Sequence, residues 1–146
     1  MSVAAGLAAA GKIPFASTFA IFGAGRAYEQ IRNSICYPKL NVKIALTHAG
    51  LTVGEDGATH QMLEDIALMR VLPNMTVIVP ADAEETKAAV KWAASYQGPV
   101  YIRMGRAKCD DVTAENTPFV PGKAMVLRKG YDITIIACGI MVGKAL

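Results

Sequence analysis

Most of the side chains that could take part in chemistry lie in one stretch, from residue 47 to residue 61. Both histidines of the chain, His48 and His60, are there, with the carboxylates Glu55 and Asp56 between them. An imidazole has a pKa near ~6.5 and can donate, accept or carry a proton. A lone histidine most often just hydrogen-bonds its own loop. Two of them beside carboxylates and glycines favour substrate binding or proton transfer.

The same residues lack the spacing of a metal site. The sequence contains no HxxxH or HExxH motif, and none of its three cysteines lies near the histidines. We therefore expect no metal ligand on this chain.

A second group of candidates is aromatic. Phe15, Phe19 and Phe22 are three of the four phenylalanines of the chain and lie within eight residues. They fit either a packed core or a flat apolar surface on which an aromatic ligand stacks, and the sequence periodicity does not decide between the two.

Two glycines follow these aromatic residues, and two arginines lie much later in the chain. Gly23 and Gly25 form a GxG motif, but Tyr28 stands where a dinucleotide fingerprint needs its third glycine, so we predict a turn at a helix N-terminus. Arg103 and Arg106 follow an apolar run and could together hold a phosphate or carboxylate.

The elements that must position these residues alternate along the chain. Strands are predicted at residues 42–47, 76–79, 100–103 and 132–137, with a short strand or extended loop at 14–20, and helices at 2–10, 25–38, 61–72, 82–96 and after Gly139. Asp82 and Glu85 have the spacing of a capping box. This alternation predicts an α/β fold, a parallel sheet with helices on both faces, whose ligands bind at the carboxyl ends of the strands.

Composition narrows the functional classes. The chain has 146 residues, 53% hydrophobic and 18% charged, with a net charge of +3 and no basic run, which excludes disorder and makes nucleic acid an unexpected partner. Its longest uncharged run, from Ile13 to Gly25, is 13 residues, too short for the ~20 that span a bilayer. Three cysteines without a CxxC pair predict a reducing, cytoplasmic compartment. The surplus of apolar residues predicts surface that is buried against another domain or chain.

Four motifs resemble the pyrimidine-binding domain of transketolase. They are STFAIF at residues 17–22, TH at 47–48 followed by GEDGATHQ at 54–61, RVLPN at 70–74 followed by PAD at 80–82, and MGR at 104–106. They occur in the family's order over nearly the whole chain. Residues 25–38 and the C-terminal tail, residues 122–146, most resemble the split transketolases, in which the diphosphate-binding domain is a separate polypeptide.

The resemblance implies a cofactor, a reaction and residue roles. Transketolases of the pentose phosphate pathway use thiamine diphosphate and magnesium or calcium to move a two-carbon ketol unit from a ketose phosphate to an aldose phosphate. Phe19 and Phe22 would pack on the aminopyrimidine ring, and Glu55 would also contribute to cofactor binding. His48, Asp56 and His60 would contact the sugar, with His48 and His60 catalytic, and Arg106 would pair with its phosphate.

The resemblance also implies how the chain is organised and assembled. Residues 1–121 would be the pyrimidine-binding domain, and residues 122–146 a linker and the start of the C-terminal domain. The metal and diphosphate ligands would lie on a partner domain or subunit, and this domain would also form a homodimer. The family's activating glutamate precedes the segment that matches Met1, so we expect a chain that is incomplete at both ends and inactive alone.

Two alternatives remain open at this stage. A deoxyxylulose phosphate synthase-like enzyme shares the superfamily but fits GEDGATHQ and STFAIF less well. A non-catalytic assembly or regulatory module would explain a missing glutamate, although the joint presence of His48, Asp56, His60 and Arg106 argues against it.

Overall fold

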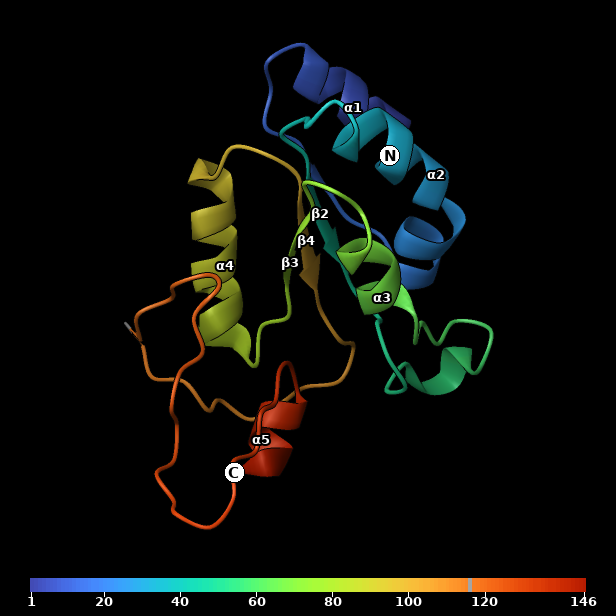
Figure 1. Cartoon of the computed structure of the whole chain (residues 1–146). Coiled ribbons are helices and arrows are strands. Elements are labelled where there is room, and N and C mark those ends of the chain that lie inside the picture. Colours follow the sequence, from blue (N-terminus) through green and yellow to red (C-terminus); the bar gives the residue numbers. More distant parts are fainter. Residues whose placement is uncertain (116) are drawn as a thin grey trace.

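The computed structural model describes residues 1–115 and 117–146 and contains a sheet in which every strand pair is parallel. The strands are β1 (Phe15–Ala16), β2 (Lys43–Leu46), β3 (Thr76–Ile78) and β4 (Val100–Arg103), in the spatial order β1-β2-β4-β3. All four carboxyl ends therefore lie at one edge of the sheet, which is the lower edge in Figure 1.

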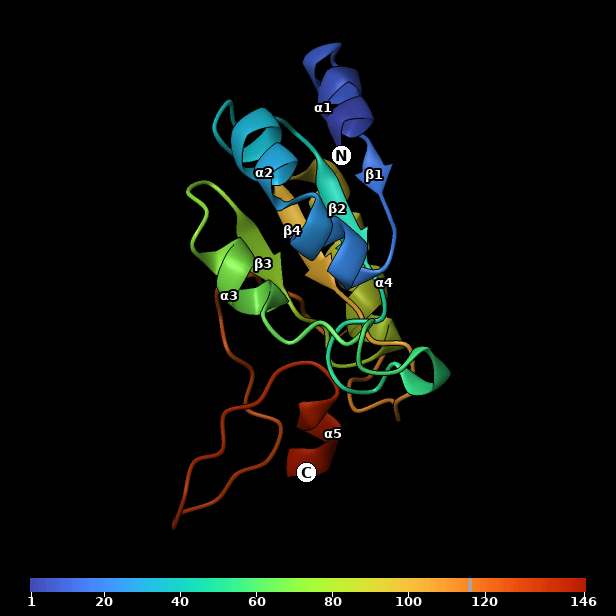
Figure 2. The same cartoon turned by 90° about the vertical axis from the view of Figure 1, so that its right-hand side faces the viewer.

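Helices cover both faces of this sheet, as predicted. One face carries α1 (Ser2–Ala9), α2 (Tyr28–Gln30) and α3 (Asp65–Arg70), and the other carries α4 (Ala83–Ser95) (Figures 1 and 2). The short α5 (Met141–Ala145) lies beyond the carboxyl edge. No helix in the described residues is both long enough and apolar enough to cross a bilayer.

The central strands are buried on both sides of the sheet. Because successive side chains of a strand point to opposite faces, each strand contributes to both sides. Ile44 and Leu46 of β2 pack in the apolar cluster beneath α1 and α2, whereas Ala45 between them packs toward α4. On β4, Tyr101 faces the first cluster, and Val100 and Ile102 face the second. A continuous apolar run thus serves two cores at once.

The cap predicted at Asp82 is present, although the Glu85 side chain reaches the N–H of Ala81 and not that of Asp82 itself. Asp82 Oδ1 accepts the Glu85 N–H at 2.8 Å, and the Glu85 carboxylate accepts the Ala81 N–H. The second Asp82 oxygen accepts the N–H groups of Val112 and Thr113 at 2.8 and 2.6 Å, which ties the following segment to the helix. Burial alone would raise the pKa of Asp82, but these hydrogen bonds lower it below its ordinary value.

The helix predicted from residue 25 begins earlier than expected. A π-helical segment runs from Ile21 to Arg26, α2 follows, and a second π-helical segment runs from Ile31 to Cys36. The turn predicted at Gly23 and Gly25 was wrong, since both glycines lie inside the first segment. Gly23 is needed for close packing: a Cβ there would lie 2.9 Å from Leu46 Cδ2 and nearer still to Cδ1.

The helix predicted at residues 61–72 is shorter, because its first part is extended. Met62 forms bridges with Ala49 and Gly50, and its carbonyl accepts the Gly50 N–H at 2.8 Å. Only Asp65–Arg70 is α-helical. The apolar side chain of Met62 is fully buried, but it is buried from a strand-like backbone.

The strand predicted at residues 132–137 is not formed. Ile133, Ile135 and Ile136 are 79%, 64% and 90% exposed, and no described strand pairs with this segment. A β-branched run becomes a strand only where a neighbouring edge supplies hydrogen bonds, and none of the described strands does so here.

Replacing Gly23 by Ala will destabilise the chain by about 1–3 kcal/mol, because the new methyl group must displace the fully buried Leu46 side chain. Gly6→Ala is the matched control: Gly6 is helical and a Cβ added there would meet no atom within 4 Å, so that variant will be neutral or about 0.5–1 kcal/mol more stable. Urea denaturation of both variants checks this, and equal effects would contradict it.

Candidate functional site

The candidate site begins where β1 and β2 continue past their last named residues. Ala20 N–H donates to the Thr47 carbonyl at 2.8 Å, and Thr47 N–H donates to the Thr18 carbonyl at 3.0 Å. This parallel bridge places Phe19 directly beside the residue that follows β2. The carboxyl edge thus joins two motifs that are almost thirty residues apart.

His48 stacks on Phe19. Their ring centroids are 3.6 Å apart and their planes differ by 15°. His48 has a left-handed backbone (φ 60°), a conformation that costs a residue other than glycine roughly 1–2 kcal/mol. Its Nδ1 lies 2.9 Å from the Thr47 hydroxyl oxygen. Strain of this kind, held by neighbouring contacts, is typical of functional sites.

His60 and Phe22 complete the cluster. The ring centroids of Phe22 and Phe19 are 5.9 Å apart and their planes are nearly parallel. The His60 ring is roughly perpendicular to both, with its centroid 5.4 Å from that of Phe22 and 6.2 Å from that of Phe19. The Arg26 guanidinium lies 4.8 Å above the Phe22 ring, and His60 Nδ1 lies 2.9 Å from the Thr59 hydroxyl. Both phenylalanines and both histidines are half-buried, so the cluster is open to a ligand.

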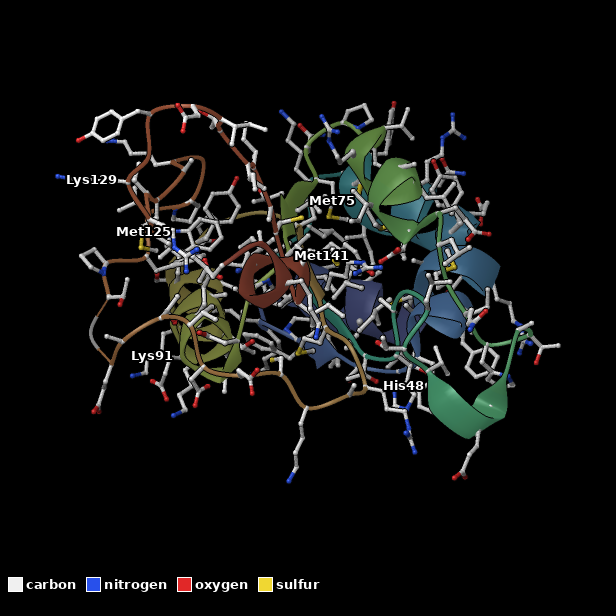
Figure 3. All side chains as sticks on the ribbon, turned by 90° about the horizontal axis from the view of Figure 1, so that it is seen from below. His48, Met75, Lys91, Met125, Lys129 and Met141 are labelled. Atoms are coloured by element: carbon white, nitrogen blue, oxygen red, sulfur yellow. The ribbon has the colours of Figure 1, made fainter. Side chains whose placement is uncertain are left out.

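Glu55 and Asp56 lie on an adjoining exposed turn, and Arg106 lies close to it. Glu55 and Asp56 belong to the 3₁₀ turn Gly54–Asp56, which lies beside the labelled His48 in Figure 3. The Arg106 guanidinium lies over this turn: a Cβ on Gly54 would be 2.9 Å from Arg106 Nη1. The structure therefore groups these three residues around one turn, next to the aromatic cluster.

The second arginine of the predicted anion pair is engaged elsewhere. Arg103 Nε donates to Asp65 Oδ2 at 2.7 Å, and the Tyr101 hydroxyl donates to the same oxygen at 2.6 Å. Asp65 thus holds the Nε of Arg103, whereas Arg106 is exposed; joint action of the two arginines on a ligand stays a prediction. Burial, then the hydrogen bond to Asp65 and its charge, raises the pKa of Tyr101 far above its ordinary value.

Sequence reasoning missed this network and one other buried charge. Tyr101 and Arg103 are two positions apart on a strand, a spacing that places both on one face and could have indicated a shared partner. Lys43 is fully buried at the amino end of β2 and donates to Asn41 Oδ1 and to the carbonyls of Tyr96 and Gly98. Burial lowers the pKa of Lys43 to about 8.

The described residues offer no cluster of three or more histidine, cysteine or carboxylate side chains that could hold a metal ion. One cavity of about 350 Å³ lies between α4 and the segment that follows β4. A second, of about 400 Å³, lies near Asp82 and Cys109. Neither is lined by Phe19, Phe22, His48 or His60. The candidate site is thus an open surface cluster, able to hold a flat ring and to exchange protons at two imidazoles.

Comparison with known proteins decides the family. The family model described as "Transketolase, pyrimidine binding domain" matches residues 1–110. The chain belongs to this transketolase family. The resemblance carried by the STFAIF and GEDGATHQ motifs is thereby confirmed, as is the α/β fold with a parallel sheet.

Individual relatives agree with this assignment. A putative transketolase C-terminal section of Methanocaldococcus jannaschii is 55% identical over the whole chain, which spans 47% of that relative. A solved structure described as "Split gene transketolase, inactive beta4 tetramer" is 63% identical with a TM-score of 0.91, over 99% of this chain and 46% of the other. The 1-deoxy-D-xylulose-5-phosphate synthase of Lawsonia intracellularis is 41% identical over 99% of this chain and 23% of its own length. The chain thus spans about half the length of these two transketolase relatives.

The stacking geometry makes a spectroscopic prediction. Protons above the face of an aromatic ring resonate upfield, so Phe19→Leu will move the His48 ring protons downfield in the proton NMR spectrum and will move those of His60 less. Phe22→Leu is the matched variant and will move His60 more than His48, because Phe22 contacts His60. A His48 signal that ignores Phe19→Leu would contradict the stack.

Proposed function

We propose that this chain is the pyrimidine-binding part of a thiamine diphosphate-dependent transketolase. Assembled with a diphosphate-binding subunit, it transfers a two-carbon ketol unit from a ketose phosphate to an aldose phosphate. The observation that carries the proposal is the contact between the STFAIF and TH motifs: Phe19, Phe22, His48 and His60 form one half-open cluster at the carboxyl edge of the sheet.

The aromatic pair suits the cofactor's pyrimidine ring. Phe19 and Phe22 have nearly parallel planes, and each is only half-buried, which fits a flat heteroaromatic ring. One face of Phe19 already carries His48, so the pyrimidine is expected on a remaining face of Phe19 or Phe22. When bound, thiamine diphosphate supplies the carbanion stabilisation that ketol transfer needs.

The polar residues suit a sugar phosphate. His48 and His60 place imidazole nitrogens at the aromatic cluster, where they would orient the sugar hydroxyls and exchange protons with the reacting oxygen. Asp56 would accept hydroxyl hydrogen bonds near C2, and Glu55 would face the cofactor. Arg106, held over the same turn and exposed, would pair with the terminal phosphate through two nitrogen donors.

The remaining parts of the site are proposed to come from a partner. The described residues offer no cluster of three or more histidine, cysteine or carboxylate side chains, and the aromatic cluster is half-exposed. In the proposed assembly, magnesium or calcium and the diphosphate would bind the partner subunit, which would cover the cluster and exclude water. The description of the similar split transketolase as an inactive tetramer of one subunit type supports inactivity of this chain alone.

We further propose residues 1–121 as the pyrimidine-binding domain, which would also form the contact between two copies of this subunit. Residues 122–146 would be the linker and the start of a C-terminal domain. The family match through residue 110 and the exposed apolar segment around Ile133 and Ile136, which pairs with no described strand, support this division.

A second candidate activity is deoxyxylulose phosphate synthesis, which the 41% identity to such an enzyme favours. The two reactions differ in their donor. The synthase takes pyruvate, whereas transketolase takes a ketose phosphate, so donor choice separates them.

Reconstitution tests the proposal. The chain mixed with a diphosphate-binding transketolase subunit, thiamine diphosphate and magnesium will transfer a ketol unit from a ketose phosphate, and the chain alone will not. His60→Ala will lower kcat/KM by roughly 10²–10⁴-fold, because it removes a proton donor and acceptor at the reacting end of the sugar. Steady-state kinetics with ketose phosphate and pyruvate as alternative donors measure both.

Lys87→Gln is the control, because Lys87 is exposed on α4, pairs with Glu84 and lies away from the cluster; its kinetics will match the parent's. Transfer by the chain without a partner would refute the composite site. Turnover with pyruvate but not with a ketose phosphate as the donor would favour the synthase. Cofactor binding without turnover of either donor would favour a non-catalytic module.

A further inference from the structure

Asp65 is a fully buried carboxylate that the proposed reaction does not use. It begins α3, and its Oδ2 accepts hydrogen bonds from Tyr101 and Arg103 of β4. Its Oδ1 has no hydrogen-bond partner among the described residues. A buried acceptor left unpaired lowers the stability of a protein by about 1–3 kcal/mol, so this link between α3 and β4 has a cost in stability.

The far end of Arg103 reaches the loop that follows His48. A Cβ added to Gly50 would lie 3.1 Å from Arg103 Nη2, a tight contact that the guanidinium or the loop would have to shift to relieve. Gly50 also has a left-handed backbone, with φ +85°. The Arg103 side chain thus runs from a buried carboxylate, which its Nε contacts, to a position beside the loop backbone at Gly50.

The segment beside the guanidinium carries His48 and is held by backbone hydrogen bonds. The Ala49 N–H donates to the Met104 carbonyl at 3.1 Å, and the Gly50 N–H donates to the Met62 carbonyl at 2.8 Å. His48 precedes these anchored residues and is itself held in a left-handed conformation. The angle of its ring on Phe19 therefore depends on where residues 49 and 50 are held.

We propose that Asp65 is a positioning residue, which through Arg103 sets the path of residues 48–50 and so the orientation of the His48 ring on Phe19. The inference rests on the proposed role of His48 in a transketolase site. Asp65 touches neither ring, and it acts only by fixing the guanidinium. Breaking a buried ion pair is costly, whereas keeping one serves the uniqueness of a local arrangement.

Three variants of the full chain test this positioning role by proton NMR. Asp65→Asn keeps the shape but removes the charge, and Arg103→Lys keeps the charge but not the planar group that spans from Asp65 to Gly50. Both will move the His48 ring protons toward the position seen in Phe19→Leu and leave those of His60 in place. Tyr101→Phe removes only the second donor to Asp65 and will leave His48 unmoved.

Two further variants test the positioning role of Asp65 if Asp65→Asn fails to fold. Gly50→Ala leaves the Asp65–Arg103 pair intact but pushes the loop off the guanidinium, so the His48 signal will move. Gly57→Ala also places an alanine at a positive φ in the same loop (φ 70°, ψ −167°), but its nearest contact is the Glu55 carbonyl at 4.0 Å and Arg103 is not among its neighbours, so His48 will not move. Equal His48 shifts in both variants, or none in either, would overturn the proposal, as would a folded Asp65→Asn chain with an unmoved His48.

Kinetics of the reconstituted enzyme separate this inference from the proposed function. With His48 misplaced, Arg103→Lys will lower kcat/KM by about tenfold to 100-fold, mainly through KM, because a small displacement of a substrate-binding group is enough to weaken orientation. An unchanged KM beside a moved His48 signal would contradict a positioning role in catalysis. Absence of transfer by the parent enzyme would instead reject the proposed function and leave the NMR result standing.

Discussion

Parallel pairing of β1, β2 and β4 is the constraint on which the candidate site depends. Parallel strands end at the same edge, so the residues that follow β1 and β2 must meet there. The Phe19–Thr47 bridge continues this pairing beyond the last pair of β1 and β2, Ala16 with Ile44. It brings the imidazole of His48 onto the ring of Phe19. The sheet holds this edge firmly because both of its faces are buried, by α1, α2 and α3 on one side and α4 on the other.

The site combines loops at the carboxyl edge with the π-helical segment that carries Phe22, and buried polar groups lie behind these loops. Asp82 ties the segment after β4 to the start of α4, and Asp65 holds Arg103, whose guanidinium lies beside Gly50 of the loop after β2. Both carboxylates lie inside the protein and accept several hydrogen bonds, which makes each contact directional. The functional side chains can then remain half-exposed, as a site completed by a second protein surface requires.

Several parts of this arrangement were predictable from local patterns. The run VYIR gave β4 with its observed bounds, and the Asp82–Glu85 spacing gave the cap of α4, because both depend on neighbours in the sequence. The GEDGATHQ motif marked the polar turn correctly. What failed depended on distant contacts: Met62 is buried from an extended backbone because it pairs with Gly50, and Ile133–Ile136 forms no strand because no described edge pairs with it. The role of Arg103 was missed for the same reason, since Asp65 lies 38 residues away.

The structure of the chain assembled with a diphosphate-binding transketolase subunit and thiamine diphosphate tests the central claim most directly. The account predicts the aminopyrimidine ring in stacking contact with Phe19 or Phe22, with His48, His60 and Arg106 lining the substrate channel and the diphosphate and metal ion on the partner. An aminopyrimidine ring bound away from both phenylalanines would contradict it.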